Sequence, residues 1–208
     1  MQTLSGLYIV TPDWDDTDQL LSVTEQALLG GAALVQYRHK FADAVLRETQ
    51  ALALQALCRR YGVPFIINDF VELCLAIQAD GVHVGGTDAS VAEVRQQVGN
   101  DLIVGASCYG DLSLALAAQA AGASYVAFGG FYPSRVKKYP VTTPVSILSD
   151  AKPMVHVPNV VIGGMTVENA KPLVAAGATM VAAISSVYNA HDPCRAAQEF
   201  VALFRPAQ

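Results

Sequence analysis

Two aspartates follow two short apolar runs, and their spacing suggests metal chemistry. Residues 65–67 lead into Asp69, and residues 81–84 lead into Asp88 after two glycines and a threonine. If the two runs are adjacent parallel strands, both carboxylates leave the sheet at the same edge, on strands about 5 Å apart. Magnesium prefers carboxylates together with substrate phosphates. The spacing therefore predicts a Mg²⁺ site at Asp69 and Asp88.

Both aspartates also have a simpler interpretation as helix N-caps, because each precedes a segment with helical character. For Asp88, just before Ala89 and Ser90, capping and metal contact can both apply. Zinc is less favoured, because His83 falls inside the run 81–84 and the other histidines are dispersed. We expect His83 to be a core histidine with satisfied hydrogen bonds.

Basic residues gather at two further places. Arg38 and Lys40 alternate at the end of the apolar run 33–38, so their side chains are expected to project to the same side. The second group lies in one loop and consists of Arg135, Lys137 and Lys138. Arginine offers a bidentate fork and lysine a mobile charge for phosphate oxygens. Solvated loop charges are the alternative, and the paired positions 38 and 40 favour an anion site.

Glycines near the end of the chain give a second phosphate argument. Gly163 and Gly164 precede a helix expected to start near Thr166, and Ser185 and Ser186 follow the run 180–184. Glycine lets backbone amides approach an anion closely, and helix N-termini bind phosphate. Ordinary turn glycines are the alternative. Two phosphate-directed regions with an aspartate pair between them predict a diphosphate substrate bound through Mg²⁺.

The elements that must position these residues alternate regularly along the chain. Strands are expected at residues 7–10, 33–38, 65–67, 81–84, 102–106, 125–128, 159–162 and 180–184. Helices are expected at 16–29, 41–61, 70–79, 90–98, 111–121, within 143–155, at 166–176 and at 191–204. Glycine and proline mark most helix ends.

This alternation predicts an α/β fold, a closed parallel (β/α)8 TIM barrel that forms a single domain over residues 1–208. A doubly wound open sheet is the alternative, and it would usually show a G-x-G-x-x-G turn after its first strand. Here that turn reads Thr11-Pro12-Asp13, which favours the barrel. In such barrels the active site lies at the carboxyl ends of the strands.

Composition excludes several classes of function. The net charge of −5 argues against a nucleic-acid-binding surface, and 52 % hydrophobic residues argue against disorder. Cysteines 58, 74, 108 and 194 form no C-x-x-C pair, so buried thiols in a reducing compartment are expected. No secretion signal or membrane span is expected, and a cytoplasmic protein is predicted. Its partners are expected to be small molecules, with a homo-oligomer left open.

Eight short segments, taken together, resemble the thiamine-phosphate synthase family over nearly the whole chain. They are GLYIVTPD from residue 6, VQYRHK from 35, IIND from 66, DGVHVGGTDA from 80, GASCY from 105, YPSRVKK from 132, VIGGM from 161 and AAISS from 182. Each is short, but their order and spacing are specific. The family joins 4-amino-2-methyl-5-(diphosphooxymethyl)pyrimidine to 4-methyl-5-(2-phosphooxyethyl)thiazole, and gives thiamine phosphate and pyrophosphate.

The resemblance implies a role for each matching residue. It assigns Gln36, Arg38, Lys40 and Asn68 to the pyrimidine diphosphate, Ser107 to the pyrimidine, Asp69 and Asp88 to Mg²⁺, Lys137 to the diphosphate, Ser134 and Val136 to the thiazole-phosphate loop, and Gly164, Ile184 and Ser185 to the thiazole-phosphate pocket. Tyr37, His39, Arg135 and Gly163 join the substrate-binding set as their neighbours, and Arg38, Lys40, Ser107 and Lys137 form the catalytic set. The implied mechanism is dissociative, with diphosphate leaving before the thiazole nitrogen attacks.

The chain departs from the family pattern at three places. The loop usually reads P-T-x-T-K, whereas here Val136 replaces a hydroxyl-bearing residue; Gly86 replaces a frequent glutamine, and Tyr109 a frequent histidine. A thiazole tautomerase-like paralogue and a non-catalytic thiazole-phosphate or thiamine-phosphate binding protein are therefore kept as alternatives. The retained diphosphate-directed and metal-directed residues favour the synthase.

Overall fold

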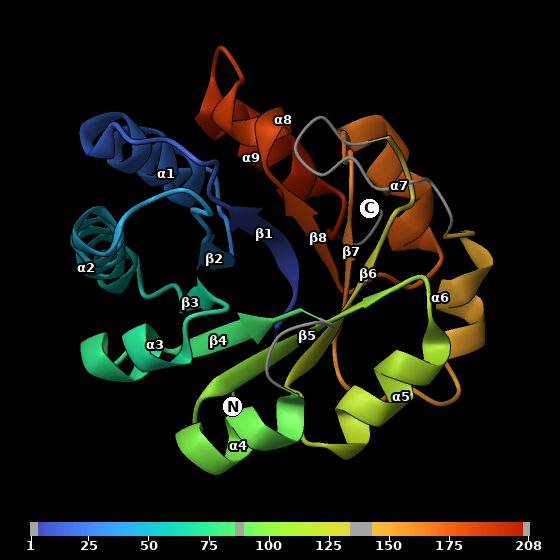
Figure 1. Cartoon of the computed structure of the whole chain (residues 1–208). Helices are drawn as coiled ribbons and strands as arrows, with labels where there is room; N and C mark the ends of the chain where they lie inside the picture. The colour runs from blue at the N-terminus through green and yellow to red at the C-terminus, as the bar shows by residue number, and fades with distance from the viewer. Residues whose placement is uncertain (1–3, 86–89, 134–142, 206–208) are drawn as a thin grey trace.

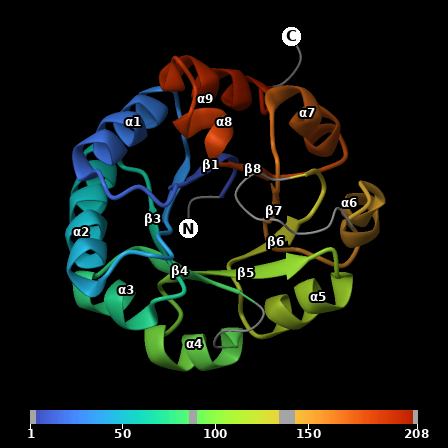
Figure 2. The same ribbon diagram turned by 45° about the horizontal axis from the view of Figure 1, so that its top comes forward.

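The computed structural model describes residues 4–85, 90–133 and 143–205. Eight parallel strands pair in chain order, and β8 pairs with β1, so the sheet closes into a barrel (Figures 1 and 2). The strands are β1 (Gly6–Val10), β2 (Leu34–Tyr37), β3 (Phe65–Asn68), β4 (Gly81–Val84), β5 (Ile103–Tyr109), β6 (Tyr125–Gly129), β7 (Asn159–Ile162) and β8 (Met180–Ala183). The predicted TIM barrel is confirmed.

Helices surround the barrel on its outside, as Figure 2 shows. In the described residues they are α1 (Thr17–Leu29), α2 (Ala44–Tyr61), α3 (Val71–Ile77), α4 (Val91–Val98), α5 (Leu112–Ala120), α6 (Ser146–Ala151), α7 (Val167–Ala175), α8 (Ser185–Tyr188) and α9 (Pro193–Ala202). Side-chain N-caps start most of the long ones. Asp16, Ser90, Asp111, Thr166 and Asp192 each accept a hydrogen bond from a backbone amide of the first turn.

Two predicted boundaries were wrong by three residues each. Helix α2 starts at Ala44 and not at residue 41, because the Asp43 carboxylate accepts the Leu46 amide at 2.8 Å and fixes the start. Strand β5 continues past residue 106 to Tyr109, with a register irregularity between Ser107 and Tyr109. Helix α6 covers Ser146–Ala151, within the predicted range 143–155, whereas the short helix α8 was not predicted.

The strands separate two layers of buried side chains. The first fills the barrel interior and includes Tyr8, Val10, Leu34, Ile66, Tyr125, Ala127, Val160, Met180 and Ala182. Side chains on the opposite faces of the strands, such as Leu7, Ile9, Phe65 and Ile67, pack in a second layer with the helices. The interior is therefore a packed core, and a ligand can meet the barrel only at its ends.

The cysteines agree with the expectation of buried thiols. All four cysteines are free; Cys58, Cys74 and Cys108 are buried, whereas Cys194 is partly buried. Within the described residues, no helix combines the length and the apolar character needed to span a bilayer.

Gly105 on β5 creates the space that one large interior side chain needs. A Cβ atom at this position would lie 2.0 Å from Cζ of Tyr125 and 2.2 Å from its hydroxyl oxygen. The Tyr125 ring is completely buried, so it has no room to withdraw. The missing side chain at residue 105 is therefore a packing requirement.

We predict that Gly105→Ala destabilises the fold by about 1–3 kcal/mol, because overpacking forces Tyr125 off its position. Urea unfolding measures the free energy of unfolding of the variant and of the wild-type protein. Gly129→Ala on β6 is the matched control, since its Cβ atom would meet Cγ2 of Ile162 at an ordinary 3.5 Å. Equal losses in the two variants would contradict this account.

Candidate active site

The candidate residues that the structure describes lie at or just beyond the carboxyl ends of the strands. Gln36 and Tyr37 end β2, Asn68 ends β3, and Ser107 lies near the end of β5. Ile184 follows β8, and Ser185 is the first residue of α8. Because all strands are parallel, these positions share one rim of the barrel.

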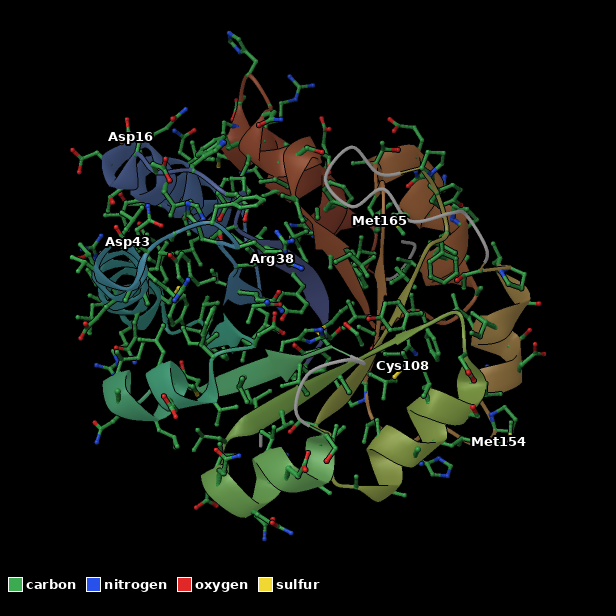
Figure 3. All side chains as sticks on the ribbon, viewed as in Figure 1. Asp16, Arg38, Asp43, Cys108, Met154 and Met165 are labelled. Atoms are coloured by element: carbon green, nitrogen blue, oxygen red, sulfur yellow. The ribbon has the colours of Figure 1, made fainter. Side chains whose placement is uncertain are left out.

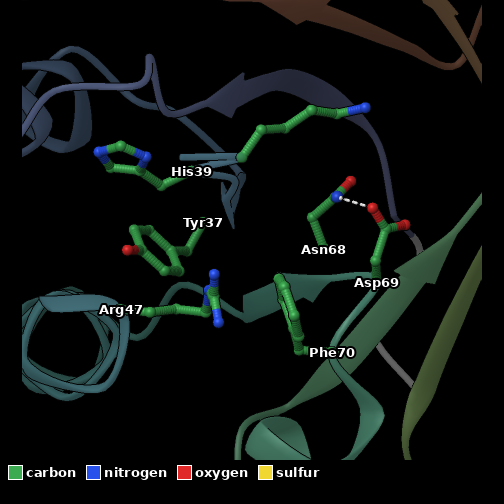
Figure 4. A pocket seen from close by; sticks show the side chains of 7 residues that line it. Tyr37, His39, Arg47, Asn68, Asp69 and Phe70 are labelled. Atoms are coloured by element: carbon green, nitrogen blue, oxygen red, sulfur yellow. Dashed lines mark hydrogen bonds between the residues drawn. The ribbon is translucent and has the colours of Figure 1, made fainter. Parts of the chain in front are cut away.

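A pocket of about 200 Å³ opens between the ends of β2 and β3 (Figure 4). Its lining consists of Tyr37, His39, Lys40, Arg47, Asn68, Asp69 and Phe70. Five of these residues belong to the predicted substrate-binding and metal-binding sets. The pocket therefore brings a lysine ammonium group and a carboxylate from neighbouring strands to one place.

Asp69 adopts an unusual backbone conformation at this rim. Its φ is +65°, a left-handed value that costs free energy in residues other than glycine, although aspartate tolerates it better than most. Its amide donates to the carbonyl of His83 at 2.8 Å, and its carboxylate accepts the Asn68 side-chain amide at 2.5 Å (Figure 4). The conformation places the carboxylate at the pocket wall.

Helix capping does not explain Asp69. The N-cap of α3 is Phe70, and no side chain caps that helix. At α4, Ser90 is the N-cap and forms a capping box with Glu93. The capping interpretation is therefore wrong for Asp69, and the N-cap of α4 is Ser90, whereas Asp88 lies outside the described residues.

Arg38 is held at the start of the β2–α2 loop by the β1–α1 loop. Its side chain is only 6 % exposed and lies beside β1 and β2 (Figure 3). Its Nη1 donates to both carboxylate oxygens of Asp13 at 3.3 Å, and the Lys40 amide donates to Oδ1 of Asp13 at 2.8 Å. Among the described residues, Nε of Arg38 has no hydrogen-bond partner. The guanidinium is thus oriented, desolvated and incompletely hydrogen-bonded.

His39 anchors the same loop. Its Nδ1 accepts the amides of Ala42 at 3.0 Å and Phe41 at 3.3 Å, so the ring proton belongs on Nε2, which donates to Asp15 at 3.0 Å. Both ring nitrogens are engaged within the chain. The substrate contact predicted for His39 stays a prediction.

A chain of polar side chains crosses the barrel interior below the rim. Gln36 Nε2 donates to the Tyr8 hydroxyl at 2.6 Å, and the Tyr8 and Tyr125 hydroxyls are 2.7 Å apart. His83 continues the chain, with Nδ1 at 2.9 Å from the Tyr125 hydroxyl and Nε2 at 2.9 Å from Oγ of Ser107. The prediction of a hydrogen-bonded core His83 is confirmed.

The tyrosines of this chain were not predicted from the sequence. Burial raises the pKa of Tyr8 and of Tyr125 above the ordinary value, so both phenols keep their protons at neutral pH. The sequence signal that could have revealed these residues is a tyrosine at an inward-facing position of a predicted strand. Such a residue needs a buried partner for its hydroxyl.

Both candidate phosphate glycines have left-handed backbone conformations. The φ values are +112° for Gly163 and +62° for Gly164, and a Cβ atom at Gly164 would lie 2.2 Å from the carbonyl oxygen of Pro133. The loops after β6 and β7 therefore touch at this point. The Gly164 carbonyl also accepts Nδ2 of Asn169 at 2.9 Å. The positive φ angles favour glycine at both positions, and the close approach of Pro133 excludes a side chain at residue 164.

Arg47 on α2 is a pocket residue that sequence reasoning missed. Its guanidinium carbon lies 3.9 Å from the centre of the Phe70 ring, and Figure 4 shows the two groups facing one another. Its Nη2 donates to the Ala42 carbonyl at 2.5 Å. A basic residue in the first turn of the helix after the Arg38–Lys40 segment was the available signal.

Several predicted site residues lie outside the described residues. They are Asp88, Ser134, Arg135, Val136 and Lys137, and Gly86 and Lys138 also belong to these segments. Their roles stay predictions.

Comparisons with known proteins agree with the resemblance seen in the sequence. A family model described as "Thiamine monophosphate synthase" matches residues 7–187. The chain is 70 % identical to a thiamine-phosphate synthase from Janthinobacterium sp. (strain Marseille), over 97 % of both chains. It is 49 % identical to one from Thiobacillus denitrificans (strain ATCC 25259 / T1), over 96 % of this chain and 94 % of the relative.

A solved structure gives the same result. Thiamine phosphate pyrophosphorylase from Pyrococcus furiosus superposes with a TM-score of 0.83 at 30 % identity, and the match covers 95 % of this chain and 94 % of that one. The resemblance seen in the sequence therefore extends to the fold.

We predict that Asp13→Ala destabilises the protein by roughly 2–4 kcal/mol, because it leaves the buried Arg38 charge without its carboxylate. Asp13 is itself 22 % exposed, so the loss falls below that of a fully buried pair. Urea unfolding measures the change in the free energy of unfolding. Glu199→Ala, which removes the exposed pair with Arg195, is the control and should cost about 0.5 kcal/mol or less. Similar losses in both variants would show that burial of Arg38 is unimportant.

Proposed function

The chain belongs to the thiamine monophosphate synthase family, and on that premise we propose that it condenses the pyrimidine diphosphate with the thiazole phosphate to give thiamine phosphate and pyrophosphate. It is a transferase of thiamine biosynthesis that acts on small molecules. The observation that carries the proposal is the pocket that joins Lys40, Asn68 and Asp69 next to the desolvated Arg38.

The two substrates take different parts of the rim in this proposal. Gln36, Arg38, Lys40 and Asn68 bind the pyrimidine diphosphate, with Ser107 at the pyrimidine and Lys137 at the diphosphate. Gly164, Ile184 and Ser185, with Ser134 and Val136, bind the thiazole phosphate. Support for the second group comes from the glycine geometry and from the position of Ser185 as the first residue of α8.

We propose Mg²⁺ as the metal, held by Asp69 and Asp88. The donor chemistry fits: the Asp69 carboxylate lines the phosphate-directed pocket, and hard oxygen ligands with substrate phosphates suit Mg²⁺. When bound, the ion would neutralise negative charge on the departing diphosphate.

The barrier in this reaction is separation of charge as the diphosphate leaves. Arg38 and Lys40 lower it by electrostatic stabilisation, since a preoriented cation loses little solvation at that moment. Asn68 holds the Asp69 carboxylate in place through its side-chain amide. The aminopyrimidine stabilises the resulting cation, and the thiazole nitrogen captures it.

No side-chain nucleophile is needed, and the Cys108 thiol is unsuited to that role. Burial raises the pKa of the Cys108 thiol to about 12, so it stays protonated at neutral pH. The tautomerase-like and binding-protein alternatives require no diphosphate-directed cations, so they leave Arg38 and Lys40 unexplained. The free buried thiols support a reducing, cytoplasmic location.

We predict that the purified protein releases pyrophosphate only when both substrates and Mg²⁺ are present, because capture of the pyrimidine cation needs the thiazole. A coupled pyrophosphate assay and chromatography of thiamine phosphate measure the reaction. Reactions without the thiazole phosphate, or with a chelator, are the controls. Binding or isomerisation of the thiazole phosphate without pyrophosphate release would refute the synthase proposal.

We predict that Asp69→Asn lowers kcat on the order of 100-fold, with the remaining activity shifted to higher Mg²⁺ concentration, because one charged ligand is lost. Asparagine tolerates the positive φ at this position, so the fold should persist. A titration of activity against Mg²⁺ measures the shift. Asp101→Asn, an exposed residue just before β5, is the control. Wild-type turnover at low Mg²⁺ would exclude the metal role.

A further inference from the structure

The polar chain in the barrel interior joins two predicted substrate-binding residues, Gln36 and Ser107, through three residues that have no assigned role. In order from Gln36 to Ser107, the three are Tyr8, Tyr125 and His83. The exposed fractions of these three side chains are 2 %, 0 % and 8 %. Their hydroxyl and imidazole groups are therefore shielded from water, and their hydrogen-bond partners must come from the protein itself.

The donors in this chain can be ordered from the chemistry of its first member. The Gln36 amide nitrogen can only donate, so the Tyr8 oxygen accepts, and the Tyr8 proton then points to the Tyr125 oxygen. The Tyr125 proton in turn points to Nδ1 of His83, and Nε2–H of His83 donates to Oγ of Ser107. Both phenols have a proton to give, because burial raises their pKa.

The consequence falls on the two end residues. Gln36 uses its amide nitrogen inside the barrel, so its oxygen is the end of the amide that can accept from a ligand. Ser107 accepts from His83, so its own proton is available for donation. One end of the chain therefore offers an acceptor and the other end a donor.

The rings in the middle of the chain are held firmly. The Tyr8 and Tyr125 rings meet edge to face with centroids 5.8 Å apart, and the His83 ring stacks on Tyr125 at 5.6 Å with an interplanar angle of 20°. Gly105 leaves the space that the Tyr125 phenol occupies. Packing thus fixes the positions of the hydroxyls on which the ordering depends.

We propose that Tyr8, Tyr125 and His83 are positioning residues that set Gln36 as acceptor and Ser107 as donor for the amino and ring-nitrogen edge of the pyrimidine. This inference rests on the proposed function. An aminopyrimidine offers an N–H donor beside a ring-nitrogen acceptor, which complements such a pair. A 4-oxo analogue presents the opposite pattern, a carbonyl acceptor beside a ring N–H donor.

The chain makes the two ends interdependent. To accept the oxo analogue, the Gln36 amide must turn, both tyrosine hydroxyls must reverse, and the His83 proton must move to Nδ1. A break in the middle would let each end reverse alone. The intact chain therefore selects the amino compound more strongly than two independent residues would.

The experiment compares kcat/KM for the 4-amino and 4-oxo pyrimidine diphosphates in Tyr8→Phe, Tyr125→Phe and the double variant. Each single variant should lower the amino-to-oxo ratio by roughly 3–10-fold, the usual effect of one hydrogen bond. The double variant should lower it no further, because either change already breaks the chain. The KM for the thiazole phosphate should not change.

Tyr188→Phe is the matched control, since it removes another buried tyrosine hydroxyl, one that bonds Thr24 at 2.8 Å on the helix side of the sheet. It should leave the ratio at the wild-type value. Thermal unfolding verifies that each variant folds. An unchanged ratio in folded Tyr125→Phe, multiplicative losses in the double variant, or an equal rise in the KM for the thiazole phosphate would overturn the inference.

A second measurement needs no turnover. Nitrogen-15 NMR of the histidines, with His83 assigned by its absence in His83→Gln, should show the proton on Nε2 and an unprotonated Nδ1. A proton on Nδ1 would overturn the ordering. If the wild-type protein releases no pyrophosphate, the proposed function fails, whereas a normal wild-type rate with an unchanged ratio in the variants refutes only this inference.

Discussion

Closure of the parallel barrel is the constraint on which the rest of the structure depends. Strand β8 pairs with β1, so every strand delivers its last residue to the same rim. Groups as distant in sequence as Gln36 and Ser185 therefore share one rim. The same closure fills the interior with side chains and leaves the rim as the place for ligands.

Below the rim lies the chain of hydrogen-bonded side chains that runs from Gln36 to Ser107. This chain restricts which residues can occupy the barrel interior. Each buried hydroxyl or imidazole nitrogen that lost its partner would cost about 1–3 kcal/mol, so the interior chain must be complete or absent. Tyr125 occupies the centre, because its hydroxyl meets both Tyr8 and His83. The glycine at position 105 follows from this arrangement, since any side chain there would displace the Tyr125 ring.

Local signals predicted the elements, whereas contacts between distant segments could not be predicted. Caps such as Ser90 and Asp192 are local hydrogen bonds, and the helices that they begin were predicted to start within two residues of their observed starts. The Tyr8 and Tyr125 hydroxyls meet across 117 residues, and no spacing rule reports such a contact. Whether the Asp69 side chain caps a helix or lines the pocket depends on the backbone φ angle of Asp69. The dipeptide Asn68-Asp69 does not determine this angle.

The pairing of Arg38 with Asp13 explains how a buried cation can serve a diphosphate. Charge-assisted hydrogen bonds of this type are usually about 2.7–2.9 Å long, whereas both contacts here measure 3.3 Å. The carboxylate therefore orients the guanidinium without using its full hydrogen-bonding capacity, and Nε has no partner among the described residues. In the proposed function, a diphosphate oxygen binds on this side to a donor that is already desolvated and held in place. The unfavourable free energy of holding Arg38 in this position is offset during folding and not during the reaction. Electrostatic stabilisation of a departing anion requires such a preorganised group.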